Sequence, residues 1–345
     1  DESADQIGYS LTLKAGENAK RLKTVARRAS ALGISVMLKP HIWIHGGVPR
    51  QKIKASNFKS AYRVKRWQAS YRAFILAYAK LAKQIHAKEF VIGLELDSLV
   101  IAWPDYWRKL IDDIRKVYGG KLVYAANWDQ APRIPIWNAL DAIGIQFFAP
   151  LIKQKTESAN DRSHHNRFKT PLMAADYGRY YQSNKNISLM TQAHDQAASW
   201  LKKYEAIARK YHKPLMLTEA GFLNHASTLR APYVWPENLK EESPASQPKQ
   251  SQRSRTQPHA SDSSATTDVN TLIGTTKDIG EQSQAIGYQA VIDTFGRSLH
   301  VAQIDWWKWF SDPNSKEEYP IGFSPRHKLA ETLLHTHCKK SITSQ

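Results

Sequence analysis

The stretch FVIGLELDSL, residues 90 to 99, is an apolar run that indicates the fold of this chain and that ends in one carboxylate. An unbroken apolar run of this length is typical of a strand that is buried on both faces. We therefore predict a buried strand that leads into Glu95. An acid at such a place is an ordinary polar strand end, one half of a structural ion pair, or a functional group.

Segments typical of helices alternate with segments typical of strands on both sides of this stretch. Apolar residues recur at three- and four-residue spacing from Glu17 to Leu32 and stop at Gly33, which predicts a helix with a glycine end signal. A long helix with Trp67 and Tyr71 on its buried face is predicted next. Further helices are expected over residues 106–117, near residue 137, over 192–211 and 284–298, and from residue 325.

Six apolar segments are predicted as strands. They are ISVMLKPHI (34–42), FVIGLEL (90–96), LVYAAN (122–127), AIGIQFF (142–148), PLMLTE (214–219) and VAQIDWW (301–307). Strands that are apolar throughout and separated by helices predict an α/β fold built on a parallel sheet.

In a barrel of parallel strands, the functional site lies at the carboxyl ends of the strands and in the loops after them. Two glutamates stand at such ends, Glu95 and Glu219, and only a fold that unites distant strand ends could pair them. Two carboxylates can divide glycosidic chemistry between them, while aromatic rings stack against sugar faces. The other side chains at these positions are Lys39, His41, Asn127, Trp128, Phe148, Trp306 and Trp307.

The segments VMLKPHIWI, FVIGLELDSL, KLVYAANWDQ, LDAIGIQFFAPL, KPLMLTEAGF and QIDWWKWF, in this order, resemble glycoside hydrolase family 113. This is a family of β-mannanases in the retaining (β/α)8-barrel clan. The resemblance runs from about Leu11 to Lys328, apart from one low-complexity insertion. It implies a TIM barrel that cleaves β-1,4-linked mannan or related β-glycans with retention, with carboxyl groups roughly 5 to 5.5 Å apart and no metal or organic cofactor.

The resemblance also implies roles for individual residues. Glu95, at the end of the fourth barrel strand, would be the acid/base, and Glu219, at the end of the seventh, the nucleophile, one with a raised pKa and the other ionised. The substrate cleft would be lined by Lys39, His41, Asn127, Trp128, and Trp306 or Trp307. Trp235 is a further candidate sugar platform, with a place in the core an equal alternative.

The sequence departs from the family pattern in three places. Leu94 stands where clan members commonly carry a polar residue before the acid/base. The sixth strand carries Phe147 and Phe148 where an aromatic hydroxyl is usual, so we expect Glu219 to lack a donor. No segment is left for barrel strands one and two, because residues 1–16 cannot hold a strand, a helix and a strand. A catalytically impaired carbohydrate-binding remnant is therefore the alternative hypothesis.

The net charge of +18 raises the possibility of a polyanion partner. The basic residues from Lys14 to Arg28 and from Arg50 to Arg66 alternate with apolar residues, which predicts solvated faces of outer helices and no specific nucleic-acid binding. The single cysteine, Cys338, excludes an internal disulfide, and the His pairs at 164–165 and 335–337 do not have the spacing of a compact metal site. No segment has the roughly 20 apolar residues that a membrane span requires.

We expect one domain over residues 1–345, interrupted by a disordered insertion at 241–284 that is rich in Ser, Gln, Thr, Pro and Lys. Asp97, Asp129 and Asp305 are expected to orient loops or hold basic neighbours. We expect the protein to be a monomer that binds an oligosaccharide or polysaccharide. Its compartment is periplasmic or extracellular if a leader precedes Asp1, and cytoplasmic otherwise.

Overall fold

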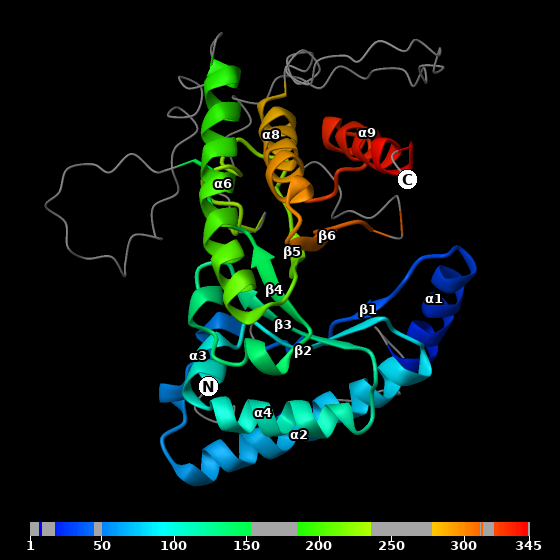
Figure 1. Ribbon diagram of the computed structural model, residues 1–345, viewed down its shortest axis with the longest axis vertical. Helices are drawn as coiled ribbons and strands as arrows, with labels where there is room; N and C mark the ends of the chain where they lie inside the picture. Colours follow the sequence, from blue (N-terminus) through cyan, green and yellow to red (C-terminus); the bar gives the residue numbers. More distant parts are fainter. Residues whose placement is uncertain are drawn as a thin grey trace, which may run out of the picture. The chain divides into compact units, whose positions relative to one another are not determined.

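The computed structural model describes residues 7–8, 18–44, 50–152, 185–235, 278–310, 312 and 321–343. Helices and strands alternate along these residues (Figure 1). The strands are β1 Met37–Leu38, β2 Glu89–Leu94, β3 Lys121–Asn127, β4 Ala142–Phe147, β5 Leu215–Ala220 and β6 Val301–Trp306. The α-helices are α1 Ala19–Ala31, α2 Ala61–Gln84, α3 Asp97–Ala102, α4 Pro104–Arg115, α6 Lys185–Tyr211, α8 Ile279–Thr294 and α9 Leu329–Thr343. Short 3-10 turns are η1 Arg50–Lys52, η2 Ala55–Asn57, η3 Ala131–Arg133, η4 Trp137–Ala139 and η8 Phe295–Arg297.

The six strands form one sheet and follow one another across it in chain order, from β1 to β6. Each neighbouring pair from β1 to β5 is parallel, with Ala125 of β3 opposite Gly144 of β4 and Gly144 opposite Met216 of β5. Parallel strands in sequential order, separated by helices, are the arrangement of a TIM barrel. The predicted fold class, with six strands in a TIM-barrel-like α/β fold, is confirmed.

Burial on both faces of the sheet explains why the strands are apolar throughout. Every residue of β2, β4 and β5 is buried. On one face, Leu94 packs with Val91 and Met216 in a hydrophobic cluster. On the other, a Cβ atom on Gly93 would lie 2.8 Å from the Tyr71 hydroxyl of α2, so only glycine fits there. The sheet therefore has no solvated face at β2.

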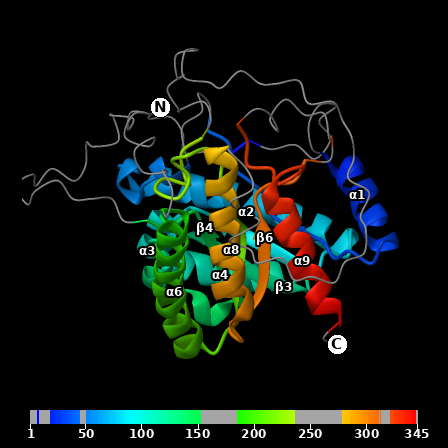
Figure 2. The same ribbon diagram turned by 90° about the horizontal axis from the view of Figure 1, so that it is seen from above.

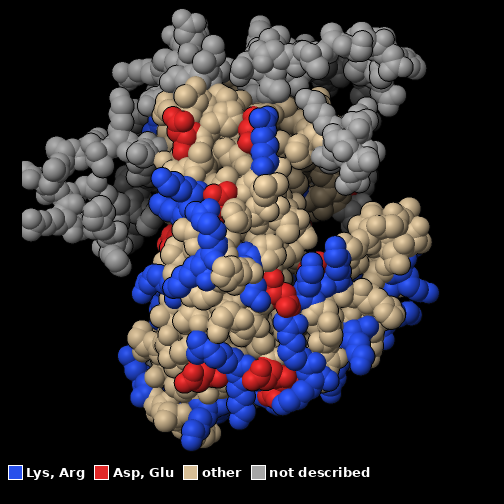
Figure 3. Space-filling view, in the orientation of Figure 1, with Lys and Arg blue, Asp and Glu red and all other residues tan. Residues whose placement is uncertain are grey.

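The predicted helices are present, although α6 and α8 begin seven and five residues earlier than the sequence predicted and the short α3 was not predicted. Asn18 caps α1 by accepting a hydrogen bond from the Arg21 amide, and Gly33 follows the helix with a φ of 70°. In α2, Trp67 stacks on Tyr71 with ring centroids 4.8 Å apart, and both are buried. Helix α4 packs beside α2, since its Trp107 lies 5.2 Å from the Tyr71 ring (Figure 1). Lys and Arg side chains spread over the outer surfaces of α1 and α2 (Figure 3). The expected solvated basic faces are therefore confirmed for the described residues of these two helices, whereas Arg50 is an exception.

The chain divides into two compact units. The first comprises Asp1–Phe147, Leu201–Ala220 and Ser298–Asp305, and the second comprises Phe148–Trp200, Gly221–Arg297 and Trp306–Gln345. In the second unit, α8 and α9 lie side by side (Figure 1, Figure 2). The buried Gln284 of α8 donates a hydrogen bond to the Phe222 carbonyl at 2.9 Å, and Phe222 packs edge-on against Tyr288.

Two segments singled out in the sequence fall largely outside the described residues. The His pair at 164–165 lies wholly outside them. The predicted insertion at 241–284 is described only from residue 278, and α8 begins at Ile279, so the helix reaches back into that segment. Its upstream part stays a prediction, as does the single domain.

Candidate functional site

The two glutamates singled out in the sequence lie in the first unit, at the carboxyl ends of β2 and β5. Glu95 directly follows β2 and is 8% exposed, while Glu219 is the last residue but one of β5 and is 6% exposed. Two other strands separate β2 from β5, so the sheet must curl to bring them together. The negative charge of Glu219 contributes to the raised pKa of Glu95, so the two carboxylates share one site.

Glu219 is held by cationic and imidazole groups from the segment after β1. The Lys39 ammonium forms an ion pair with Oε1 of Glu219 and donates a second hydrogen bond to the Thr218 carbonyl at 2.8 Å. Nε2 of His41 lies 3.9 Å from the same carboxylate oxygen. The expectation that Glu219 lacks a donor is therefore wrong: Lys39, which follows β1, supplies it, and no aromatic hydroxyl is needed.

The neighbouring strand β4 supports this carboxylate indirectly. Gln146 is the residue opposite Glu219 in the ladder, and its side-chain oxygen accepts a hydrogen bond of 2.8 Å from the Thr218 hydroxyl. Both side chains are buried. Because the Thr218 carbonyl binds Lys39, the Gln146–Thr218 bond fixes the backbone that carries both the carboxylate and one acceptor of its ammonium partner.

Glu95 has different surroundings. Nη2 of Arg50 donates to its Oε2 at 3.1 Å. Burial raises the pKa of Glu95 from 4.5 to about 7, Arg50 lowers it, and Glu219 and Asp97 raise it. The net effect of these surroundings is to favour the protonated form of Glu95. Its backbone φ of 54° is in the left-handed region, which is unusual for a residue other than glycine.

His41 is a neutral imidazole at neutral pH. Burial lowers its pKa from 6.5 to about 3, with further lowering by the charges of Arg50 and Lys39. Its ring stacks on Trp43 with centroids 6.4 Å apart. A neutral histidine beside Glu219 can serve as a hydrogen-bond donor without adding a third cation to the site.

Arg50 is the site residue that sequence reasoning missed. It was assigned to a solvated helix face, but its side chain is only 15% exposed and binds Glu95, so that assignment is wrong. It belongs to η1, a short turn in the long connection between β1 and α2. The one signal that could have found it is its place in a loop after a strand end, where barrel sites are built.

Asn127 is brought to the same end of the sheet, and Asp97 holds it there. The side-chain and backbone nitrogens of Asn127 donate to Asp97 Oδ2 at 2.8 and 3.2 Å, and the Tyr124 hydroxyl donates to Oδ1 at 2.8 Å. Burial raises the pKa of Asp97 to about 6. Asp97, which was expected to orient a loop, thus fixes the last residue of β3. Trp128 follows and is half-buried, its carbonyl accepting from the Tyr204 hydroxyl at 2.9 Å.

A sequence-family comparison decides the class of protein. The model of Glycoside Hydrolase Family 113 matches residues 3–255. The chain belongs to glycoside hydrolase family 113. Membership supports a glycoside hydrolase function and a carbohydrate substrate. No curated protein matches the chain.

Solved structures of this family share the fold. A complex of a GH113 β-1,4-mannanase is 18% identical, with 97% of this chain and 83% of that chain covered and a TM-score of 0.63. A second GH113 β-1,4-mannanase is 19% identical over 95% and 81%, also at 0.63. The GH113 β-mannanase AaManA from Alicyclobacillus acidocaldarius, in complex with ManMIm, is 16% identical over 98% and 83%, at 0.67.

The three remaining candidate tryptophans of this family 113 chain belong to the second unit. Trp306 stacks on the buried Tyr288 of α8, with ring centroids 4.3 Å apart and planes 16° apart. Trp235 and Trp307 meet edge to face at 6.2 Å, and Trp235 is 40% exposed. The stack on Tyr288 gives Trp306 a packing role, while sugar stacking by any of the three stays a prediction.

Other site types are not represented in the described part of the chain. Within it, no group of three or more His, Cys, Asp or Glu side chains could hold a metal ion. None of its helices combines the length and apolar character that crossing a bilayer requires.

Proposed function

We propose that the chain is a retaining glycoside hydrolase that cleaves β-1,4-linked mannan or a related β-glycan, with Glu95 as acid/base and Glu219 as nucleophile. One observation carries the proposal: two buried carboxylates of one site each have a cationic partner, but burial outweighs that partner at Glu95. Burial favours the neutral form of Glu95, whereas Glu219 is ion-paired with Lys39. Pairs of acids whose environments differ in this way are typical of an acid and a nucleophile.

In the first step, neutral Glu95 gives its proton to the glycosidic oxygen while the Glu219 carboxylate attacks the anomeric carbon. The bond to the leaving sugar breaks, and a covalent glycosyl-enzyme forms on Glu219. In the second step, ionised Glu95 takes a proton from a water molecule, which attacks the same carbon and releases Glu219. A pKa of about 7 suits Glu95 to both tasks.

The contacts of the remaining residues divide them between two tasks. Lys39 and His41 lie against Glu219, so we infer that they orient the nucleophile as well as line the cleft. Asn127, fixed by Asp97, and its neighbour Trp128 are proposed to contact sugar at the same strand ends. Mannan is the preferred substrate because the similar structures are named as β-mannanases.

The proposal is tested by replacing each acid and comparing it with a matched control. Glu95→Gln and Glu219→Gln are expected to lower kcat on β-mannan by at least about a hundredfold. Glu89→Gln is the control, because Glu89 is also buried, at 2% exposed, but lies at the amino end of β2, far from the end that Glu95 follows. Hydrolysis by both site variants at the rate of the parent would show that the assignments are wrong.

An aryl β-mannoside separates the two roles. A dinitrophenyl leaving group departs without protonation, so formation of the glycosyl-enzyme by Glu95→Gln should be nearly normal, seen as a burst of dinitrophenolate. Glu219→Gln should give no burst, because it lacks the attacking carboxylate.

A carbohydrate-binding remnant of the same fold is the second candidate. It is favoured by the ion pairs that engage both carboxylates and by Leu94, which is buried in the core where a polar neighbour of the acid is common. Calorimetry on the unmodified chain that showed manno-oligosaccharide binding without turnover would support this candidate over the first.

A further inference from the structure

Arg50 is fixed on three sides beside Glu95. Its Nη2 donates to Oε2 of Glu95 at 3.1 Å, and its Nη1 donates to the Ile42 carbonyl at 3.4 Å. Its guanidinium carbon lies 5.8 Å from the centre of the Trp43 ring, within the range of a cation–π contact. A planar guanidinium held at three points has one orientation, so its bond to Glu95 has a defined geometry.

The chemistry of this bond selects one oxygen of Glu95. A guanidinium donates hydrogen bonds and has no acceptor, so Oε2 must be the acceptor whether Glu95 is neutral or ionised. The carbonyl oxygen of a neutral carboxylic acid is a better acceptor than its hydroxyl oxygen, so the bond to Arg50 favours Oε2 as the carbonyl oxygen and Oε1 as the oxygen that carries the proton. No described residue makes a hydrogen bond to Oε1, which leaves that oxygen available to an incoming glycosidic oxygen.

We propose that Arg50 is a positioning residue that directs the transferable proton of Glu95 to Oε1 and keeps that oxygen oriented for proton transfer. The role in proton transfer rests on the proposed function, whereas the selection of the oxygen rests on the contact alone.

Charge gives Arg50 a second effect on the same acid. The charged groups that act on Glu95 are Arg50, Glu219 and Asp97. Arg50 lowers the pKa of Glu95, while the two acids and burial raise it. Without the guanidinium only the raising effects are left, so the Glu95 carboxyl would stay protonated to a higher pH.

The test compares Arg50→Gln, Arg50→Lys and a control, Arg72→Gln. Arg72 is also bonded to an acid, with Nε 2.8 Å from Oδ2 of Asp113, but this pair joins α2 to α4. The titration of Glu95 is followed by NMR of glutamate labelled with carbon-13 at the side-chain carboxyl, with the signal assigned by its loss in Glu95→Gln. The pH dependence of kcat and KM on β-mannan is measured in parallel.

In Arg50→Gln, the titration of Glu95 and the alkaline limb of kcat should both move up by about one to three pH units. At the optimum, kcat should fall about tenfold with KM within twofold. Arg50→Lys keeps the positive charge but loses the planar guanidinium. The alkaline limb of its kcat profile should therefore stay near that of the parent, while kcat at the optimum falls. Arg72→Gln should match the parent in both readouts.

An unchanged titration of Glu95 in folded Arg50→Gln would overturn the proposal. If that variant does not fold, a parental kcat in Arg50→Lys would overturn it, because the fork geometry would then be dispensable. If the Glu95 titration moves although the parent hydrolyses no β-glycan, the contact has the inferred effect and the proposed function is the part that fails.

Discussion

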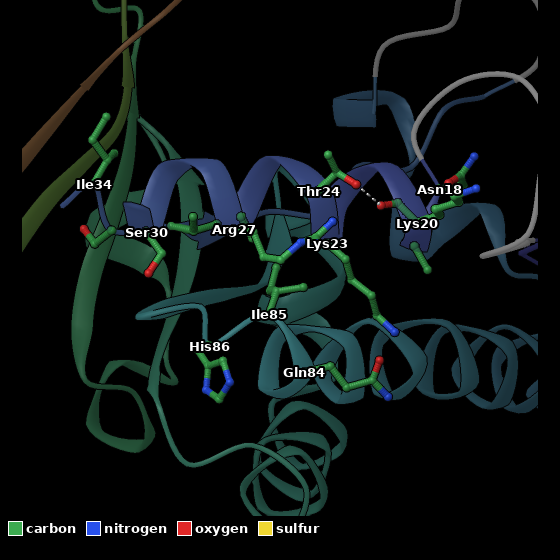
Figure 4. Close-up of a pocket in the computed structure, with 14 residues that line it drawn as sticks. Asn18, Lys20, Lys23, Thr24, Arg27, Ser30, Ile34, Gln84, Ile85 and His86 are labelled. Atoms are coloured by element: carbon green, nitrogen blue, oxygen red, sulfur yellow. Dashed lines mark hydrogen bonds between the residues drawn. The ribbon is translucent and has the colours of Figure 1, made fainter. Parts of the chain in front are cut away.

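Two regions of the first unit gather cationic side chains and differ in what those cations meet. At the strand ends, Lys39 and Arg50 each bind a buried glutamate. A pocket of about 1060 Å³ between α1 and the turn after α2 is lined by Lys20, Lys23 and Arg27, and no Asp or Glu is among its lining residues (Figure 4). This pocket thus lacks the paired acids on which the proposed chemistry depends.

The comparison shows that positive charge alone says little about function in this chain. The cations of the pocket are exposed on α1 and screened by solvent, whereas those of the site are half-buried and paired. Burial strengthens each interaction at the strand ends and makes it sensitive to the loss of one partner. Substitutions matched across the two regions should therefore differ sharply in effect.

The largest difference is expected between Lys39→Met and Lys23→Met. Removing Lys39 leaves Glu219 buried without its ammonium partner, which should lower the free energy of unfolding by about 4 kcal/mol. Lys23→Met, in the pocket, should change it by no more than about 0.5 kcal/mol. Urea denaturation at pH 7 measures both free energies of unfolding. Equal effects of the two substitutions would contradict the expected difference between the site and the pocket.

The next effect is the dependence of stability on pH. Glu95 has a pKa of about 7 in the folded protein and 4.5 as its ordinary value. The folded state therefore holds a proton that the unfolded chain releases, so the free energy of unfolding should fall as pH rises through this window. The loss attributable to Glu95 is about 3 kcal/mol. It is measured as the difference between parent and Glu95→Gln in denaturation from pH 4 to pH 8, and Lys23→Met should retain the parental slope.

A smaller effect is expected from the bonds that fix Asn127. Tyr124→Phe removes one donor to Asp97, which should lower the free energy of unfolding by about 1.5 kcal/mol and raise the pKa of Asp97 further. Tyr62→Phe is the control, because Tyr62 is 70% exposed. Thermal denaturation of both variants distinguishes a buried bond from a general effect of losing a hydroxyl.

The smallest effect is expected in the pocket. Lys23 has Lys20 and Arg27 as like-charged neighbours three and four positions away on α1, and such pairs weaken a helix by a few tenths of a kcal/mol. Lys23→Gln should therefore raise the free energy of unfolding by about 0.5 kcal/mol at low salt, and the gain should vanish in about 1 M salt. A destabilised Lys23→Gln would show that this cation has an acidic partner after all.

The strand pattern made much of the fold predictable, because a strand that is buried on both faces has apolar residues at nearly every position. The residues at strand ends could be predicted for the same reason, and Glu95, Glu219, Lys39 and His41 are indeed grouped. The length of β1 could not, since only Met37–Leu38 pair within the predicted 34–42. Pro40 stands two residues after Leu38 and has no amide hydrogen for a ladder.

The partners of the two acids were not predictable, because they depend on contacts between distant segments. Lys39 reaches Glu219 across a separation of 180 residues. Arg50 had the local pattern of a helix surface, and nothing in its neighbours indicates that its guanidinium turns toward Glu95. Periodicity reports which face of an element is buried, but it carries no information about which polar groups meet there.

The left-handed backbone at Glu95 has a consequence for how the protein would respond to selection for stability. A φ of 54° favours glycine or asparagine and disfavours a glutamate by about 1 kcal/mol. A library screened for heat resistance alone should therefore enrich Gly or Asn at position 95, and a library screened for hydrolysis should retain the acid. The frequency of Glu at this one position would then report which of the two pressures had acted on the population.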